Sequence, residues 1–198
     1  MDEILNNTVE QSVTKVLIAL TKKNSGHRIL VASMDGHLSD EVDGIYVEQD
    51  GKARIFSLNE KSVRYGIDSP NLPSDDIHYE QIVDSFGGMD GQKSTSILID
   101  IFHLGKNDAA VEASEYGWLP EAGEFELAVN NLEAFNTLAV AAGGNPLSER
   151  KYWLAQRRNA KYAWFYDVAH NGLGSWLGGG NQLLIRPVKS AAGYEEEV

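Results

Sequence analysis

Short runs of β-branched and aromatic residues alternate with turn residues near the start of the chain. Four such runs occupy residues 14–20, 28–33, 44–49 and 53–58. The segment Lys22 to Gly26 separates the first two runs, and the dipeptide Asp50-Gly51 separates the last two. Turn residues between strand-like runs are typical of hairpins, so the sequence predicts two of them. Residues 59–80 contain two prolines and several Asp and Ser, which predicts a long surface loop.

The spacing of apolar residues becomes helical in the middle of the chain. Residues 90–104 carry a stripe that includes Leu98 and Phe102, and residues 109–116 form a shorter segment that ends at Gly117. A third helix follows Pro120, has a break near Asn130-Asn131, and ends at Gly143-Gly144. The middle of the chain is therefore predicted to be helical.

Strand-like runs return at residues 151–154, 162–168 and 182–188. The order strands, helices, strands predicts an α+β fold, in which the C-terminal strands pair with the N-terminal ones. We expect a strand-rich segment over residues 1–80, integral to or packed on a main domain over residues 81–190. The acidic tail, residues 191–198, is expected to fray.

The stretch from residue 152 to residue 188 organises the chain. It holds three of the four tryptophans and has a glycine-rich middle without apolar periodicity. This pattern predicts two or three strands that support an irregular loop and a face rich in Arg, Tyr, Phe and Trp. Such side chains provide large contact areas, so the composition favours binding over catalysis.

Charge and cysteine content narrow the classes of function. A net charge of −12 argues against binding to nucleic acid or to an anionic membrane, because both need Lys and Arg. The absence of cysteine removes disulfides, thiolate nucleophiles and sulfur-ligated metals. The sequence contains no signal peptide or membrane span, so we expect a soluble protein that is cytoplasmic or virion-associated, or at the cell surface if a signal was removed.

A series of short motifs resembles the C-type-lectin-fold modules of bacteria and phages. The matching segments are Gly-Trp-Leu-Pro-Glu-Ala-Gly-Glu at 117–124, Ala-Gly-Gly-Asn-Pro-Leu-Ser at 142–148, Tyr-Trp at 152–153, Ala-Trp at 163–164, Asn-Gly at 171–172 and Ile-Arg-Pro-Val at 185–188. The resemblance covers residues 80–190. Some members of the family are variable proteins of diversity-generating retroelements, which bind partner molecules through a hypervariable C-terminal surface.

The resemblance implies a recognition domain for a protein or glycan receptor. The chain departs from the family pattern at residues 154–157 and 173–180, which is where diversified members differ from one another. The resemblance implies a structural role for residues at matching family positions: Trp118, Pro120, Glu124, Trp153, Trp164, Arg186 and Pro187. A buried carboxylate is expected to pair with Arg186, and Glu124 is one candidate.

The residues predicted to contact a ligand are the polar and aromatic ones between the motifs. They are Gln156, Arg157, Arg158, Asn159, Lys161, Tyr162, Phe165, Asp167, His170, Ser175, Trp176, Asn181 and Gln182. The competing interpretation is an ordinary solvated edge with one exposed aromatic side chain. A cluster of this kind marks an interaction site when it is exposed together.

Two alternatives to a recognition domain remain at this stage. One is a structural or assembly subunit of a phage tail or adhesin, which would form a homo-oligomer. The other is a hydrolase built on Glu121, Glu124 and a histidine, although the same placement also suits the start of a helix. The five histidines are scattered and no calcium motif is present, so we expect no metal, no cofactor and no catalytic residues.

Overall fold

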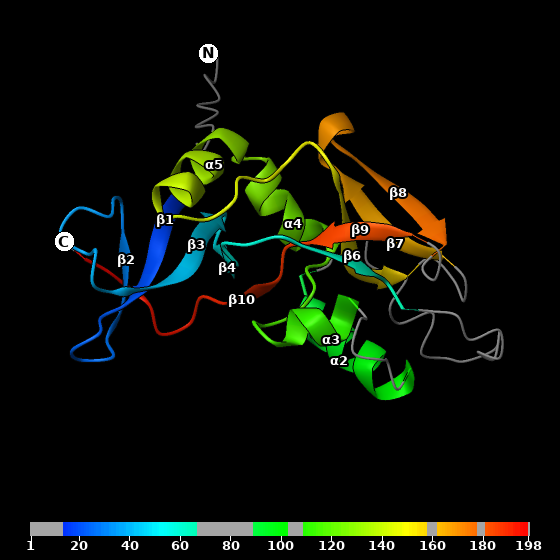
Figure 1. Ribbon diagram of the computed structural model, residues 1–198, viewed down its shortest axis with the longest axis horizontal. Coiled ribbons are helices and arrows are strands. Elements are labelled where there is room, and N and C mark those ends of the chain that lie inside the picture. Colours follow the sequence, from blue (N-terminus) through cyan, green and yellow to red (C-terminus); the bar gives the residue numbers. More distant parts are fainter. Residues whose placement is uncertain (1–13, 67–88, 103–108, 158–161, 178–180, 198) are drawn as a thin grey trace, which may run out of the picture.

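The computed structural model describes residues 14–66, 89–102, 109–157, 162–177 and 181–197 (Figure 1). Two β-sheets and a set of α-helices make up these residues, which confirms the α+β class. Several elements expected from the sequence extend into positions 67–88, 103–108, 158–161 and 178–180, which lie outside the described residues.

The first sheet contains both predicted N-terminal hairpins. Its strand order is β10-β4-β3-β1-β2-β11. The strands are β1 (Thr14–Thr21), β2 (Arg28–Val31), β3 (Glu41–Gln49), β4 (Lys52–Phe56), β10 (Val188–Ser190) and β11 (Glu195–Glu196). Asp50 and Gly51 both adopt positive φ between β3 and β4, as a tight hairpin turn requires.

The second sheet collects strands from both ends of the chain in the order β5-β9-β6-β7-β8. The strands are β5 (Lys61–Arg64), β6 (Lys151–Arg157), β7 (Tyr162–Asp167), β8 (Gly172–Leu177) and β9 (Gln182–Ile185). β9 pairs with β5, and β10 pairs with β4 in the first sheet. These pairings confirm that C-terminal strands join N-terminal ones.

Two predictions about loops are corrected by this sheet. β5 lies inside the stretch expected to be a surface loop, and β8 lies inside the glycine-rich stretch expected to be irregular. One glycine of β8 leaves room for a side chain of the neighbouring strand β7. A Cβ on Gly174 would lie 2.4 Å from the ring of Phe165, which pairs with it across the sheet.

The helices occupy the middle of the chain. They are α2 (Gly91–Phe102), α3 (Ala109–Ser114), α4 (Ala122–Val129) and α5 (Leu132–Ala141), with a short 3-10 turn, η1 (Val168–His170), after β7. The predicted break at Asn130-Asn131 separates α4 from α5. Gly143 has a positive φ after α5, in agreement with the predicted stop.

The second sheet is buried on both faces. Tyr152, Tyr166 and other residues of one face join the largest core cluster, together with α4, α5 and the inner face of the first sheet. Trp153, Phe165 and other residues of the opposite face pack against α2 and α3. Figure 1 shows the two helix pairs on opposite sides of β6, β7 and β9. The sheet that carries the candidate binding residues is thus held from two sides.

The C-terminal segment is more ordered than expected. Glu195 and Glu196 form β11, which pairs in parallel with β2. Ion pairs join Glu196 to Lys15 and Glu197 to Lys22. The prediction of a frayed tail is therefore wrong for these residues, because the acidic side chains find lysines on β1 and the adjoining turn.

Candidate ligand-binding site

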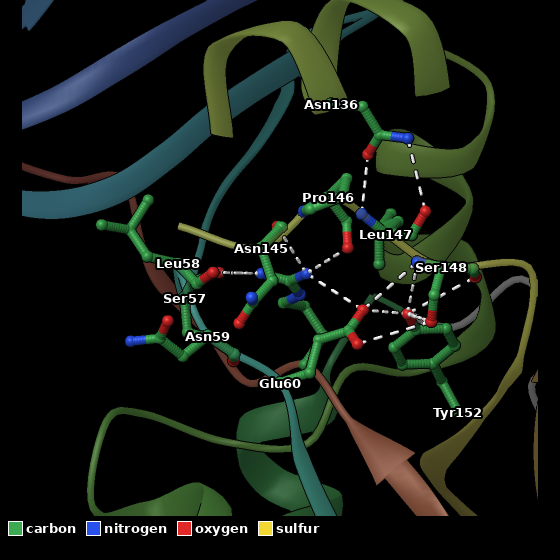
Figure 2. Close-up of polar contacts among 11 residues, drawn as sticks. Ser57, Leu58, Asn59, Glu60, Asn136, Asn145, Pro146, Leu147, Ser148 and Tyr152 are labelled. Carbon is green, nitrogen blue, oxygen red and sulfur yellow. Dashed lines mark hydrogen bonds and ion pairs between the residues drawn. The ribbon is translucent and has the colours of Figure 1, made fainter. Parts of the chain in front are cut away.

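Arg186 anchors the frame behind the candidate site. Its guanidinium is fully buried and donates hydrogen bonds to four backbone carbonyls. Nη1 bonds the oxygens of Ser57 (2.9 Å) and Leu58 (2.6 Å), and Nη2 bonds those of Asn145 (2.9 Å) and Pro146 (3.1 Å). Figure 2 shows the segment with Ser57 and Leu58 beside the segment with Asn145 and Pro146. One residue therefore ties the end of β4 to the segment before β6.

A carboxylate completes this cluster. Arg186 Nη2 lies 3.1 Å from Glu60 Oε1, and the Tyr152 hydroxyl also donates to Glu60 (Figure 2). The backbone N–H of Ser148 donates to the Tyr152 oxygen at 2.8 Å. Burial lowers the pKa of Arg186 and raises that of Tyr152. The expected partner Glu124 is thus corrected to Glu60, and we call this set the Arg186 cluster.

Glu124 belongs to a separate buried cluster. Its Oε1 accepts hydrogen bonds from Arg54 Nε (2.5 Å) and Trp118 Nε1 (3.3 Å). Its Oε2 accepts from the backbone N–H groups of Glu121 (2.9 Å) and Gly91 (3.2 Å). Burial raises the pKa of Glu124, and these hydrogen bonds oppose that shift. Glu124 therefore joins β4, α4 and the start of α2.

The Glu121 carboxylate also accepts hydrogen bonds at the start of α2. Its Oε1 accepts from the Ser94 hydroxyl at 2.6 Å, and its Oε2 accepts from the backbone N–H of Asp90 at 3.2 Å. Glu121 is 3% exposed and Glu124 is fully buried. The two carboxylates of the hydrolase alternative therefore bind backbone and hydroxyl donors at the N-terminus of α2, where negative charge is favoured.

The remaining residues with a predicted structural role lie in or beside the second sheet. Trp153 is fully buried, and its Nε1 donates to the Val63 carbonyl of β5 at 3.1 Å. Trp164 is half-buried against the core cluster of the opposite face. The carbonyls of Pro120 and Pro187 accept the backbone N–H groups of Ala155 and Ser57, both at 2.9 Å.

The register of β6, β7 and β8 brings three predicted contact residues to one end of the sheet. Arg157 pairs with Ala163, and Ala163 pairs with Trp176 on its other side. Tyr162 is the first residue of β7 and is 38% exposed. We call this end of the three strands, defined by Arg157, Tyr162 and Trp176, the hairpin end.

Two other predicted residues lie at the opposite end. Asp167 ends β7, where its carboxylate lies 2.7 Å from Lys151 Nζ and 3.0 Å from His170 Nδ1. The hydrogen bond with Lys151, followed by that with His170, holds the pKa of Asp167 below its usual range. The His170 side chain is 79% exposed. The sheet therefore does not bring all the predicted contact residues together.

The other predicted contact residues have varied positions. Gln156 is 4% exposed and accepts the backbone N–H of Ala122 at 2.9 Å, and Phe165 packs with Trp153 in the core. Ser175 and Asn181 are half-buried and Gln182 is exposed. Arg158, Asn159 and Lys161 lie outside the described residues.

Two clefts that the sequence did not indicate lie on either side of Tyr116. A cleft of about 440 Å³ is lined by Asp43, Glu60, Glu112 and Glu115 among others. A larger one of about 620 Å³ is lined by residues of α2, the end of α3, β2 and the C-terminal segment. The polar stripe on α2 is the one sign of the larger cleft in the sequence, and the residues that form the other walls are distant along the chain.

Within the described ranges, no group of three His, Asp or Glu side chains is arranged to hold a metal ion. No helix in that part of the chain is both long and apolar enough to cross a membrane.

The chain is similar to a solved structure, at low sequence identity. No family model and no curated protein matches the chain. A fimbrial protein from Bacteroides ovatus ATCC 8483, known from a crystal structure, is similar with 18% sequence identity and a TM-score of 0.48. The similarity covers 67% of this chain and 34% of the fimbrial protein, so the chain spans about a third of that protein's length.

Proposed function

We propose that the chain is a ligand-recognition domain of C-type-lectin fold, which contacts a protein or glycan receptor through the hairpin end. One observation carries the proposal. Four residues at matching family positions are buried in the frame: Trp118, Glu124, Trp153 and Arg186. Arg157, Tyr162 and Trp176 instead lie together at one end of the strands. This division between frame and contact surface is what a recognition domain requires.

The frame supports a preorganised surface. Trp118, Glu124 and Arg186 are at most 8% exposed, and each contacts a segment that is distant in sequence. Packing on both faces fixes the backbone of β6 and β7. A rigid support lowers the conformational entropy lost on binding. Because this support is built from other residues, the side chains at the hairpin end can change without loss of the fold.

Binding would rest on shape and side-chain complementarity without a metal ion or a catalytic step. Tyrosine, tryptophan and arginine bury large areas and dominate binding hot spots. The occupation of Glu121 and Glu124 by hydrogen bonds within the protein supports a structural role for both, which favours recognition over hydrolysis.

The test is a binding screen of the purified chain on glycan and cell-surface protein arrays, with calcium and with chelator. We expect a hit that survives chelation and is lost in Trp176→Ala and Tyr162→Ala. His170→Ala is the matched control, because His170 is exposed at the opposite end of the strands. Equal losses in all three variants, or a melting temperature lowered by several degrees in Trp176→Ala, would contradict the assignment of the surface.

Diversification by a phage or bacterial retroelement is a further part of the proposal. It predicts a nearby template repeat that differs from the segment encoding residues 150–188 only at adenine positions. A repeat that differs equally at all four bases would contradict it.

The second candidate function is an assembly subunit of a phage tail or adhesin. The observation in its favour is β5, a four-residue strand at the edge of the second sheet. Edge strands present backbone groups that a partner strand can pair with. Light scattering after gel filtration separates the two candidates, since an assembly subunit forms a stable oligomer and a recognition module elutes as a monomer.

A further inference from the structure

The larger cleft lies between helix α2 and the C-terminal segment. Helix α2 and Arg28 of β2 form part of its walls, and the rest comes from the end of α3 with the residues after it and from the C-terminal segment. The lining residues are Arg28, Gln92, Thr95, Ser96, Ile99, Ser114, Tyr116, Gly117, Trp118, Lys189, Ser190 and Ala192. The volume of about 620 Å³ falls in the range of small-molecule sites. It is separate from the hairpin end, which contributes no lining residue.

The charge of this cleft differs from that of the chain. Arg28 and Lys189 line it and no Asp or Glu does, although the chain has a net charge of −12. Lys189 is partly neutralised, because its Nζ lies 3.0 Å from Asp43 Oδ1. Arg28 has no carboxylate within ion-pair distance in the described part of the chain, and its guanidinium stacks over the ring of Tyr194 at 5.5 Å. Arg28 is thus an oriented cation.

Polar groups face the cleft beside this cation. Gln92, Thr95, Ser96 and Ile99 have the spacing of one helical face, and Gln92 and Ser96 are exposed on it. Ser114 and Ser190 add exposed hydroxyls from the other walls. Amide and hydroxyl groups can both donate and accept hydrogen bonds, so they suit a ligand with several hydroxyls.

The walls are fixed relative to one another. The backbones of Trp118 and Val188 exchange two hydrogen bonds of 2.9 Å, and the backbone N–H of Leu119 donates to Thr95 Oγ1 at 3.0 Å. A Cβ on Gly117 would lie 2.1 Å from the Val188 oxygen, which shows how closely the chain segments approach. The cleft is therefore preformed and needs little ordering on binding.

We propose that this cleft binds a sugar acid, with the ligand carboxylate on Arg28 and its hydroxyls on the polar stripe of α2. The planar guanidinium of arginine matches a carboxylate in two parallel hydrogen bonds. The surrounding groups are mostly neutral donors and acceptors, which favours one negative charge and several hydroxyls over a multiply charged anion.

The test is calorimetric titration of the full chain with glucuronate, and with glucose, acetate and inorganic phosphate as comparison ligands. We expect glucuronate to bind at least about tenfold more tightly than the other three, because it alone engages both parts of the cleft. Absence of saturable glucuronate binding would overturn the proposal. Acetate or phosphate binding of equal strength would show a simple anion site and would overturn it as well.

Substitutions of residues that line the cleft test where glucuronate binds. Arg28→Gln should weaken glucuronate binding about tenfold or more, through loss of the charge-assisted pair. Arg64→Gln is the matched control, because it removes the same charge from an exposed position on β5 outside the cleft. Gln92→Ala should weaken binding without affecting the contact between Arg28 and Tyr194. Unchanged binding in both Arg28→Gln and Gln92→Ala would place the ligand elsewhere.

Glucuronate binding to the cleft does not depend on residues of the hairpin end. A receptor found on the arrays and lost in Trp176→Ala should still bind to Arg28→Gln. Failure of either proposal is therefore distinguishable from failure of the other.

Discussion

Arg186 and Glu60 form a buried ion pair between positions 126 residues apart, with 3.1 Å between Nη2 and Oε1. The Arg186 side chain is fully buried and that of Glu60 is 14% exposed. Arg186 also bonds carbonyls of two loops, so the pair holds together segments that have no strand pairing between them.

Glu60→Ala is expected to destabilise the protein strongly. It leaves the buried guanidinium without its carboxylate, and loss of one partner of a buried pair costs about 3–5 kcal/mol. Glu60→Gln keeps an acceptor oxygen and should cost less than Glu60→Ala. Urea denaturation measures both. A loss below about 1 kcal/mol in Glu60→Ala would show that water or another group compensates Arg186.

The raised pKa of Glu124 predicts that the stability of the protein depends on pH. Burial raises its folded-state pKa above the ordinary 4.5, so the folded protein binds this proton more tightly than the unfolded chain. Its contribution is fully present below the unfolded pKa and is lost as pH rises through the folded pKa. The stability of the wild type relative to Glu124→Gln should therefore decrease as pH rises above 4.5. Urea titrations from acidic to neutral pH measure the difference, and an increase would contradict the raised pKa.

Gly174→Ala and Gly172→Ala form a matched pair on β8. A Cβ at Gly174 would lie 2.4 Å from the Phe165 ring, whereas the nearest atom to a Cβ at Gly172 is 3.6 Å away. Overpacking costs about 1–3 kcal/mol, so Gly174→Ala should lower the melting temperature. Gly172→Ala should be neutral or stabilising by up to about 1 kcal/mol. Equal melting temperatures would show that β8 shifts to accept the methyl group.

Thr95 connects α2 to the segment before α4. Its hydroxyl accepts the backbone N–H of Leu119 at 3.0 Å and is 3.4 Å from the carbonyl oxygen of the same residue. Thr95→Val has the same shape but leaves a buried N–H without a partner, which costs about 1–3 kcal/mol. Thr95→Ser retains the hydroxyl and should be closer to the wild type. Chemical denaturation of the two variants compares them, and equal costs would assign the effect to packing.

The sequence predicts elements well where turn residues separate segments with a clear apolar spacing. The hairpin at Asp50-Gly51 and the break at Asn130-Asn131 both follow from turn residues and apolar spacing. β5 has four residues with Val63 alone buried, which is too short for a period to be recognised. β8 contains glycines that weaken any strand pattern, although Gly174 leaves room for the ring of Phe165 on the next strand.

Long-range polar contacts are not readable from one sequence. The partner of Arg186 lies in a segment expected to be a loop, and the partner of Glu124 is Arg54 on the first sheet. Of the candidate binding residues, Arg157, Tyr162 and Trp176 lie at the same end of their strands, while Phe165 is buried. Alternation along a strand does not reveal burial when both faces of its sheet are covered.

The two-residue connection between β9 and β10 has a consequence for synthesis. β9 joins β5 to the second sheet and β10 pairs with β4 in the first, and Arg186 and Pro187 alone separate them. The second sheet has all its strands only after residue 185 has been made, and the first sheet only after β11. During translation β5 therefore lacks its partner strand until β9 has been made, and chains truncated before β9 would expose an apolar edge that chaperones bind.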